Sequence, residues 1–296
     1  GLGGGSFLVY YDAKKNSLTT FDGRETAPIK ASDDLFLTDT RDPMQFFDAV
    51  VGGRAVGTPG TVKLLWDTHK RLGIKSWSEL LRPAIDLAEK GFHVSPRMAN
   101  AVANDKFLRK HPNTAKYFYP DGGAIEQGAI LKNPAYKETL IAMAKQGGDV
   151  FYNSIISKSI VQAVQNSDNP GLLTEEDFKQ YNVIEREAVC ADYRGFDICG
   201  MGPPSSGAIA VGQTLGILNA FDLNSTGPTS PVSWNLIAEA SRLAFADRGL
   251  FIADPDFLAP PTGLLSQQYL ARRAKLITPS KALENAKPGN PSHNIA

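Results

Sequence analysis

The 296-residue sequence lacks the motifs of most self-contained catalytic centres. Its four histidines, His69, His93, His111 and His293, lie far apart, and no Cys/His spacing is typical of a metal site. No serine occupies a G-x-S-x-G elbow, and no phosphate-binding G-x-x-x-x-G-K-[ST] motif occurs. The glycines at 1–5 precede a predicted strand, whereas the glycine loop of a dinucleotide-binding fold follows one. We therefore predict no complete catalytic centre in this chain and no cofactor. If the protein is an enzyme, part of its active site lies elsewhere.

The sequence also lacks a charge excess and a long apolar run. Lys+Arg and Asp+Glu are equal at 31 each, which argues against nucleic acid or an anionic membrane as a partner. No stretch approaches the roughly 20 apolar residues that cross a bilayer. Hydrophobic residues make up 42% of the chain, enough for the core of one large domain or of two tightly joined ones. The first residue is a glycine within a motif, so we expect a processed or truncated piece that lacks its natural start and any signal peptide.

Only two cysteines are present, Cys190 and Cys199, and they flank a predicted hairpin. Side chains alternate on both arms around the two-residue turn Arg194-Gly195, which places the cysteines opposite each other in a non-hydrogen-bonded pair. Side chains come closest at such pairs, so a cross-strand disulfide is geometrically possible and would fit an oxidising compartment. The alternative is a pair of buried thiols that act as small hydrophobic residues.

The remaining pattern predicts a mixed α and β chain that is rich in helix. A hairpin is predicted from strands at 7–11 and 18–21 around a polar turn. Capping residues, Gly and Pro delimit predicted helices between Thr58 and Gly73, at 76–90, from Ser95, at 135–146, 154–165 and 174–181, from Gly207 and from Ser230. Residues 110–128 are predicted to be an irregular surface loop, and the chain from Thr278 a poorly ordered tail.

Two of the later predicted helices carry apolar residues at helical spacing. The helix after Gly207 is expected to place one group of side chains on one side: Val211, Leu215, Leu218 and Phe221. The helix after Ser230 has the strongest face: Leu236, Ile237, Ala240, Leu243 and Ala244.

The segment from Phe21 to Pro28 places Arg24 at the end of a predicted strand. A guanidinium in that position can hold a carboxylate through two charge-assisted hydrogen bonds. The alternative is a structural salt bridge with Asp22 or Glu25, which are close in sequence.

These segments, taken in order, resemble the γ-glutamyltransferase (γ-glutamyl transpeptidase) family, and specifically its large subunit. The similarity spans nearly the whole chain. The matching segments are residues 1–7, 22–28, 57–62, 83–88, 173–178, 193–196, 203–207, 245–248 and 254–257. Ser6 and Ala208 stand where family members usually carry Gly, and both changes are small.

The resemblance implies an α+β fold, the αββα sandwich of N-terminal nucleophile hydrolases, completed by a separate small subunit. Family members are precursors that cut themselves, and the nucleophile is the threonine that begins the small subunit. Residues 1–277 would then form the large-subunit part of a single domain, and residues 278–296 a tail near the processing junction. This chain ends at Ala296 without the family's Thr-Thr-His junction, so no catalytic residue is assigned to it.

The resemblance also assigns roles to individual residues. Arg24 matches the arginine that grips the α-carboxylate of the γ-glutamyl group, and Asp22 and Glu25 are interpreted as structural. Gly3 to Gly5 are expected to let the backbone pack closely beneath the site. A further group is interpreted as helix caps or ion-pair residues rather than catalytic groups: Ser205, Ser206, Asp247, Arg248 and Asp254.

The function implied is cleavage of γ-glutamyl amides such as glutathione, with transfer to water, an amino acid or a peptide. The partners implied are a small subunit, a γ-glutamyl donor and an acceptor, in a periplasmic, secreted or cell-surface location. Two alternatives remain open. One is a glutaryl or cephalosporin acylase of the same fold, and the other is a catalytically silent homologue that acts as a binding protein.

Overall fold

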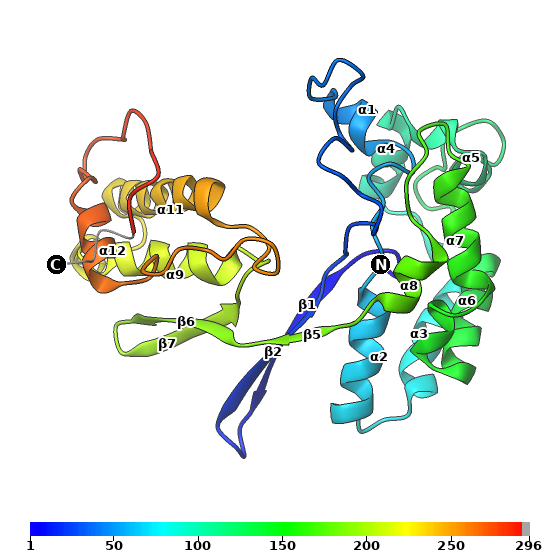
Figure 1. Cartoon of the computed structure of the whole chain (residues 1–296), viewed down its shortest axis with the longest axis horizontal. Coiled ribbons are helices and arrows are strands. Elements are labelled where there is room, and N and C mark those ends of the chain that lie inside the picture. Colours follow the sequence, from blue (N-terminus) through cyan, green and yellow to red (C-terminus); the bar gives the residue numbers. More distant parts are fainter. Residues whose placement is uncertain (292–296) are drawn as a thin grey trace. The chain divides into compact units, whose positions relative to one another are not determined.

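The structure, a computed structural model, describes residues 1–291 and forms two units (Figure 1). One unit contains Gly1–Ser6 and Gly23–Val183, and the other contains Phe7–Asp22 and the chain from Ile184 onward. The first unit is mainly helical, and the second combines strands with helices. Within residues 1–291, no helix has both the length and the apolar character that spanning a membrane requires.

The first unit forms every helix that the sequence predicts for it, and also two short helices that the sequence does not predict, at Phe46–Val50 and Pro112–Phe118. Ser76 and Glu79 form the predicted capping box at the start of α3. The predicted loop 110–128 is wrong in part, because Pro112–Phe118 forms helix α5. Its opening Pro-Asn-Thr is typical of loops and of helix N-termini alike, so composition does not separate the two. The other helices are α1 (Phe46–Val50), α2 (Thr61–Leu72), α3 (Trp77–Lys90), α4 (Pro96–Asn104), α6 (Pro134–Gln146), α7 (Ile155–Gln165) and α8 (Glu175–Gln180).

Short elements and a buried cluster complete this unit. Strands β3 (Phe92–His93) and β4 (Ile130–Leu131) pair with each other, and the 3-10 turns are η1 (Leu108–Lys110) and η2 (Gly148–Phe151). The main core lies between α2, α6, α7, α8 and η2. Its buried residues are Val62, Met143, Phe151, Tyr152, Val161, Val164, Leu173, Phe178 and Tyr181.

In the second unit, the predicted N-terminal hairpin is confirmed as β1 (Ser6–Asp12) and β2 (Ser17–Gly23). β5 (Ile184–Arg186) adds to β2 in antiparallel register and gives a three-stranded sheet of order β1-β2-β5. A second, two-stranded ribbon follows, and then the helices. These elements are β6 (Ala188–Tyr193), β7 (Phe196–Met201), α9 (Gly207–Leu218), α10 (Leu223–Thr226), α11 (Pro231–Phe251) and α12 (Gln267–Ala274).

The cysteine hairpin has the predicted register. Cys190 lies opposite Cys199 with a Cα–Cα distance of 4.1 Å, and the two residues form a disulfide rather than a pair of free thiols. Arg194 (φ 54°) and Gly195 (φ 85°) both adopt positive φ, as the two-residue turn that matches strand twist requires.

Helices α9, α11 and α12 enclose the core of the second unit. The predicted face of α11 is confirmed, with Leu236, Ala240, Leu243 and Ala244 buried. The predicted face of α9 is wrong at Val211, which is 49% exposed, whereas Ile209 is buried. Because α9 is apolar on nearly every side, its periodicity does not identify the buried face.

Asp247 of α11 is the centre of a buried polar cluster. Its carboxylate accepts hydrogen bonds from Tyr269 Oη (2.6 Å), Gln213 Nε2 (3.0 Å) and the Gly289 backbone N–H (2.8 Å), and it pairs with Arg273 at 3.1 Å. The predicted buried ion pair at Asp247 is therefore confirmed, with Arg273 as the partner.

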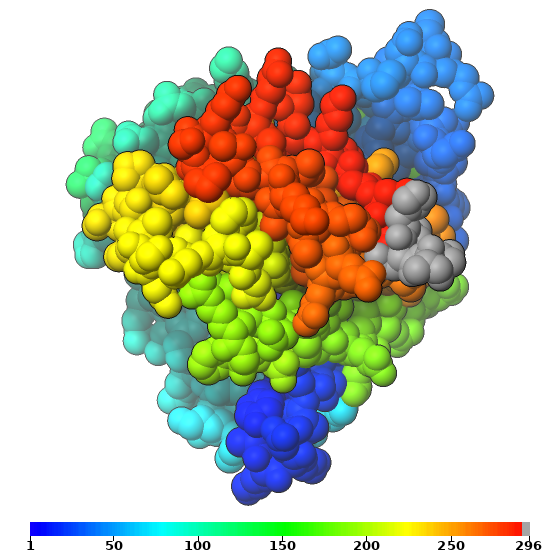
Figure 2. Space-filling view, turned by 90° about the vertical axis from the view of Figure 1, so that its left-hand side faces the viewer, coloured from blue at the N-terminus to red at the C-terminus, as the bar shows by residue number. Residues whose placement is uncertain are grey.

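The contact from Gly289 also corrects the predicted disordered tail. Residues 278–291 lie along α11 and α12, and Figure 2 shows this segment beside α12. Arg242 Nη1 donates to the Leu283 carbonyl (2.9 Å), and Arg273 Nη2 donates to the Lys287 carbonyl (2.8 Å). Hydrogen bonds from these side chains to backbone carbonyls hold a segment whose composition is typical of a loop. The rest of the predicted tail, with His293, lies outside the described residues.

We expect Asp247→Ala to lower the free energy of unfolding by about 3–5 kcal/mol, because it leaves the Arg273 guanidinium buried without a counter-charge. Asp86→Ala, which removes the exposed partner of Lys90, is the matched control and should cost less than about 1 kcal/mol. Urea unfolding of both variants measures the difference. Equal losses would show that the Asp247 cluster carries no special share of stability.

Candidate functional site

Arg24 directly follows the last residue of β2, and its side chain is exposed. Its backbone is held on one side by α8's end, because Tyr181 Oη donates to the Arg24 carbonyl at 2.7 Å. Two residues further on, Thr26 and Thr58 exchange backbone hydrogen bonds of 2.9 and 3.3 Å. Arg24 and the residues that follow it are therefore tied to neighbouring segments of the first unit.

Gly5 packs directly on the backbone of this arginine. Its N–H donates to Glu25 Oε1 at 2.5 Å, and a Cβ placed on Gly5 would lie 2.7 Å from the Glu25 nitrogen and 2.8 Å from the Arg24 Cα. The expected close packing of the N-terminal glycines is confirmed at Gly5. It is wrong at Gly3, where a Cβ would meet no atom within 4 Å.

Asp22 forms an ion pair with Arg186 of β5, at 2.9 Å from the carboxylate to Nε. The same guanidinium binds Asp256 through two hydrogen bonds of 3.0 and 2.6 Å, which lower the pKa of the Asp256 carboxyl. Asp22 thus has the structural contact expected of it. Sequence reasoning missed Arg186 and Asp256, since their distance along the chain hides the pairing.

The loops around Arg24 form a pocket of about 310 Å³ within the first unit. A second guanidinium, that of Arg54, lines it. Arg54 Nε donates to Asn169 Oδ1 and Nη1 donates to the Leu35 carbonyl, both at 2.8 Å. No sequence motif singled out Arg54. The pocket residues are Arg24, Glu25, Thr26, Ala27, Pro28, Leu35, Phe36, Arg54, Ala55, Val56 and Gly57.

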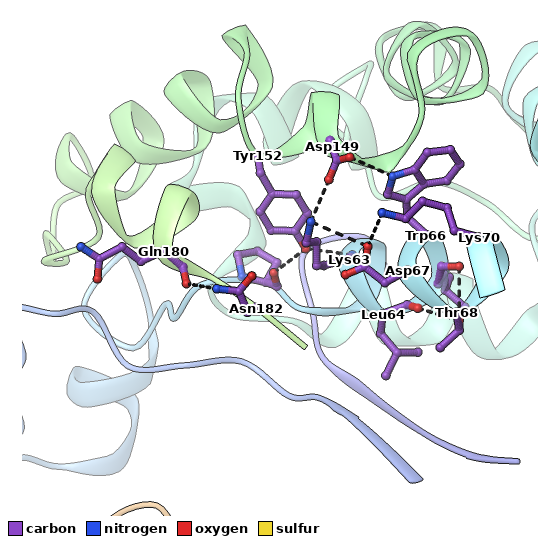
Figure 3. A network of polar contacts seen from close by, with 12 residues as sticks. Lys63, Leu64, Trp66, Asp67, Thr68, Lys70, Asp149, Tyr152, Gln180 and Asn182 are labelled. Carbon is purple, nitrogen blue, oxygen red and sulfur yellow. Dashed lines mark hydrogen bonds and ion pairs between the residues drawn. The ribbon is translucent and has the colours of Figure 1, made fainter. Parts of the chain in front are cut away.

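A polar network fixes the start of α2, which follows the Thr58 bridge (Figure 3). Tyr152 Oη donates to the Pro59 carbonyl (2.8 Å) and accepts from the Lys63 backbone N–H (3.0 Å), and burial raises the pKa of this hydroxyl. Asp149 accepts from Lys63 Nζ (2.8 Å) and Trp66 Nε1 (2.9 Å), and the hydrogen bond from Lys63 is the main cause of its lowered pKa. This network positions the 57–60 turn against the Arg24 loop.

The remaining residues of interest lie in the second unit and have structural contacts. Ser205 Oγ accepts from the Gly207 N–H (3.2 Å), as expected of a cap, whereas Ser206 makes no capping bond and instead accepts from Arg248 Nε (3.2 Å). Asp254 accepts from the backbone N–H of Asp256 at 3.0 Å. Arg248 and Asp254 were each interpreted as ion-pair residues, and the contacts described here for both are hydrogen bonds to uncharged groups.

Comparison with known proteins places this arrangement in a class. The chain superposes on the crystal structure of Helicobacter pylori γ-glutamyltranspeptidase with a TM-score of 0.92, at 30% sequence identity, covering all of this chain and 84% of that one. The α+β fold of N-terminal nucleophile hydrolases expected from the sequence is thereby confirmed.

The γ-glutamyltranspeptidase family model matches residues 1–295, and the chain belongs to that family. It is 34% identical over 292 residues to the glutathione hydrolase proenzyme of Bacillus subtilis, covering 98% of this chain and 49% of that protein. It is also 33% identical over 297 residues to the Acylase ACY 1 proenzyme of Pseudomonas sp. (strain V22), covering 97% of this chain and 51% of that protein. The chain thus spans about half the length of these curated relatives.

We expect Gly5→Ala to lower the free energy of unfolding by about 1–3 kcal/mol, because the new methyl group would press on backbone atoms of Arg24 and Glu25 that have little freedom to move. Gly3→Ala is the control, since the methyl group enters open space there and should change stability by less than about 0.5 kcal/mol. Denaturant titration of both variants tests this. A Gly5→Ala variant as stable as wild type would contradict the proposed close packing.

Proposed function

We propose that this chain is the large subunit of a γ-glutamyltransferase that cleaves γ-glutamyl amides such as glutathione. The observation that carries the proposal is Arg24, which lies in the family's Asp-Gly-Arg-Glu-Thr-Ala-Pro segment and lines a pocket on an immobilised loop. A planar guanidinium presented in this way suits a carboxylate, and we assign the α-carboxylate of the γ-glutamyl group to it.

The proposed chemistry uses a nucleophile from a partner chain. Its N-terminal threonine hydroxyl attacks the γ-carbonyl carbon, the threonine α-amino group takes the hydroxyl proton, and the amine of the donor leaves with a proton. The resulting γ-glutamyl ester is then cleaved by water or by the amino group of an amino acid or peptide. The role of this chain is to hold the donor, because a fixed α-carboxylate sets the position of the γ-carbonyl.

The partner proposed is the small subunit of the same precursor. The relatives support it, since they are named proenzymes and are about twice as long as this chain. In this proposal residues 1–277 are the large-subunit part of one domain, and residues 278–296 lead toward the processing junction. The disulfide Cys190–Cys199 supports a periplasmic, secreted or cell-surface location, where such bonds persist.

A glutaryl or cephalosporin acylase is the second candidate, and the similarity to Acylase ACY 1 favours it. A glutaryl donor keeps the carboxylate but lacks the α-amino group. Comparing glutaryl-p-nitroanilide with γ-glutamyl-p-nitroanilide therefore separates the two enzymes by which donor has the higher kcat/KM. A protein that cleaves neither would be the catalytically silent homologue.

Maturation is tested by intact-mass analysis and N-terminal sequencing of the natively purified protein. We expect a second, co-purifying polypeptide that begins with threonine. If this chain is purified alone and no anilide is cleaved, the proposal of an autoprocessed heterodimer is wrong.

Arg24→Met is expected to lower kcat/KM for γ-glutamyl-p-nitroanilide by about 100-fold, because two charge-assisted hydrogen bonds to the α-carboxylate are lost. A 4-aminobutyryl anilide, which lacks that carboxylate, should lose far less. Arg97→Met, which removes an exposed arginine of α4, is the matched control. Equal losses on both donors would count against a carboxylate-specific role for Arg24.

A further inference from the structure

Arg54 is a second guanidinium that the fold holds in a fixed orientation at the Arg24 pocket. Two of its N–H groups donate to neutral oxygens, Asn169 Oδ1 and the Leu35 carbonyl. Asn169 is itself fixed, because its amide donates to the backbone carbonyls of Asp48 (2.7 Å) and Val51 (2.9 Å). These bonds use one N–H of Nε and one of Nη1, and the three remaining N–H donors of the guanidinium are available for a ligand.

The charge of Arg54 is not balanced within the described part of the chain. The side chain is half-buried, and in residues 1–291 it forms no ion pair with a carboxylate. An arginine stays charged at any physiological pH, and a cation withdrawn from water is normally paired. Here both partners are neutral, so the arrangement leaves room for an anion.

The pocket as a whole is also cationic. Its ionisable lining residues are Arg24, Arg54 and Glu25, and one Glu25 oxygen already accepts from the Gly5 N–H. Leu35, Phe36 and Val56 supply apolar wall beside the two guanidinium groups. A ligand with an anionic group and a short apolar portion suits such a lining.

We propose that Arg54 binds a second carboxylate of the substrate, one that lies outside the γ-glutamyl group. This inference rests on the proposed function, in which Arg24 holds the α-carboxylate. Two groups carry such a carboxylate: the C-terminal end of the donor's leaving peptide, and the end of the acceptor amino acid or peptide. Arg54 thus makes the enzyme selective for a leaving group or an acceptor that carries a carboxylate over its neutral counterpart.

The donor arm of the test uses the full precursor, matured with its small subunit, as wild type, Arg54→Met, Arg54→Lys and the control Arg97→Met. Hydrolysis of γ-glutamyl-p-nitroanilide is compared with that of γ-glutamyl-3-carboxy-4-nitroanilide, which adds one carboxylate to the leaving group. For Arg54→Met we expect KM for the carboxylated donor to rise about 10- to 100-fold relative to the neutral donor. For Arg54→Lys the rise in this KM should be intermediate between wild type and Arg54→Met, because lysine keeps the charge but lacks the planar guanidinium.

The acceptor arm keeps the neutral donor and compares transfer to glycylglycine with transfer to glycylglycine amide. A selective rise in KM for glycylglycine assigns the bound carboxylate to the acceptor, and a selective effect in the donor arm alone assigns it to the leaving group. Either result supports the inference.

Two results would overturn it. The first is evidence that Arg54 has only a structural role, in which it joins the loops at Leu35 and Asn169. In that case Arg54→Met loses activity equally on all four compounds, or it unfolds at a lower temperature while Arg54→Lys keeps the selectivity of the wild type. If wild-type protein cleaves every neutral and carboxylated γ-glutamyl donor at background rate, the proposed function itself fails and the inference falls with it.

Discussion

The site depends on the immobilisation of one short backbone segment, Arg24 to Thr26. Gly5 presses on it from one side, Tyr181 binds its carbonyl, and Thr58 pairs with Thr26. A long arginine side chain has many rotamers, so it can recognise a carboxylate only if its backbone does not move. The first unit holds this backbone in place through Gly5 near its N-terminal end, Thr58 before α2, and Tyr181 directly after α8.

A second arginine, Arg54, is also immobilised, but at the end of its side chain. Arg24 is fixed through its main chain, whereas Arg54 is fixed through its guanidinium, by an asparagine that is in turn bound to two carbonyls. Recognition of small anions by proteins depends on such preorganisation more than on the number of charges. The ability of the pocket to bind an anion therefore depends on the neutral groups that fix the arginines as much as on the arginines themselves.

Local chemistry made much of the fold predictable. The capping box at Ser76, the hairpin at Arg194-Gly195 and the face of α11 each depend on residues within a few positions of one another. Arg54, Arg186 and the docking of residues 278–291 were missed, because their partners lie far away along the chain and leave no local pattern. The helix α9 was predicted, but its buried face was predicted wrongly at Val211, because α9 has apolar residues on nearly every side. At the site, motif resemblance located Arg24 but had no means of finding a residue outside the motif.

The disulfide between β6 and β7 has a consequence for which side of the ribbon meets the helices. The loop it closes is short, with a sequence separation of nine between the cysteines, so its entropic effect on the unfolded chain is smaller than that of a disulfide that closes a long loop. A two-stranded ribbon can slip, however, and a slip by one residue would turn every inward side chain outward. Val189 and Tyr193 now pack on the helical core while Cys190 lies on the opposite, exposed face. The disulfide thus fixes the register of β6 against β7. It excludes the pairing shifted by one residue and takes up no space in the core.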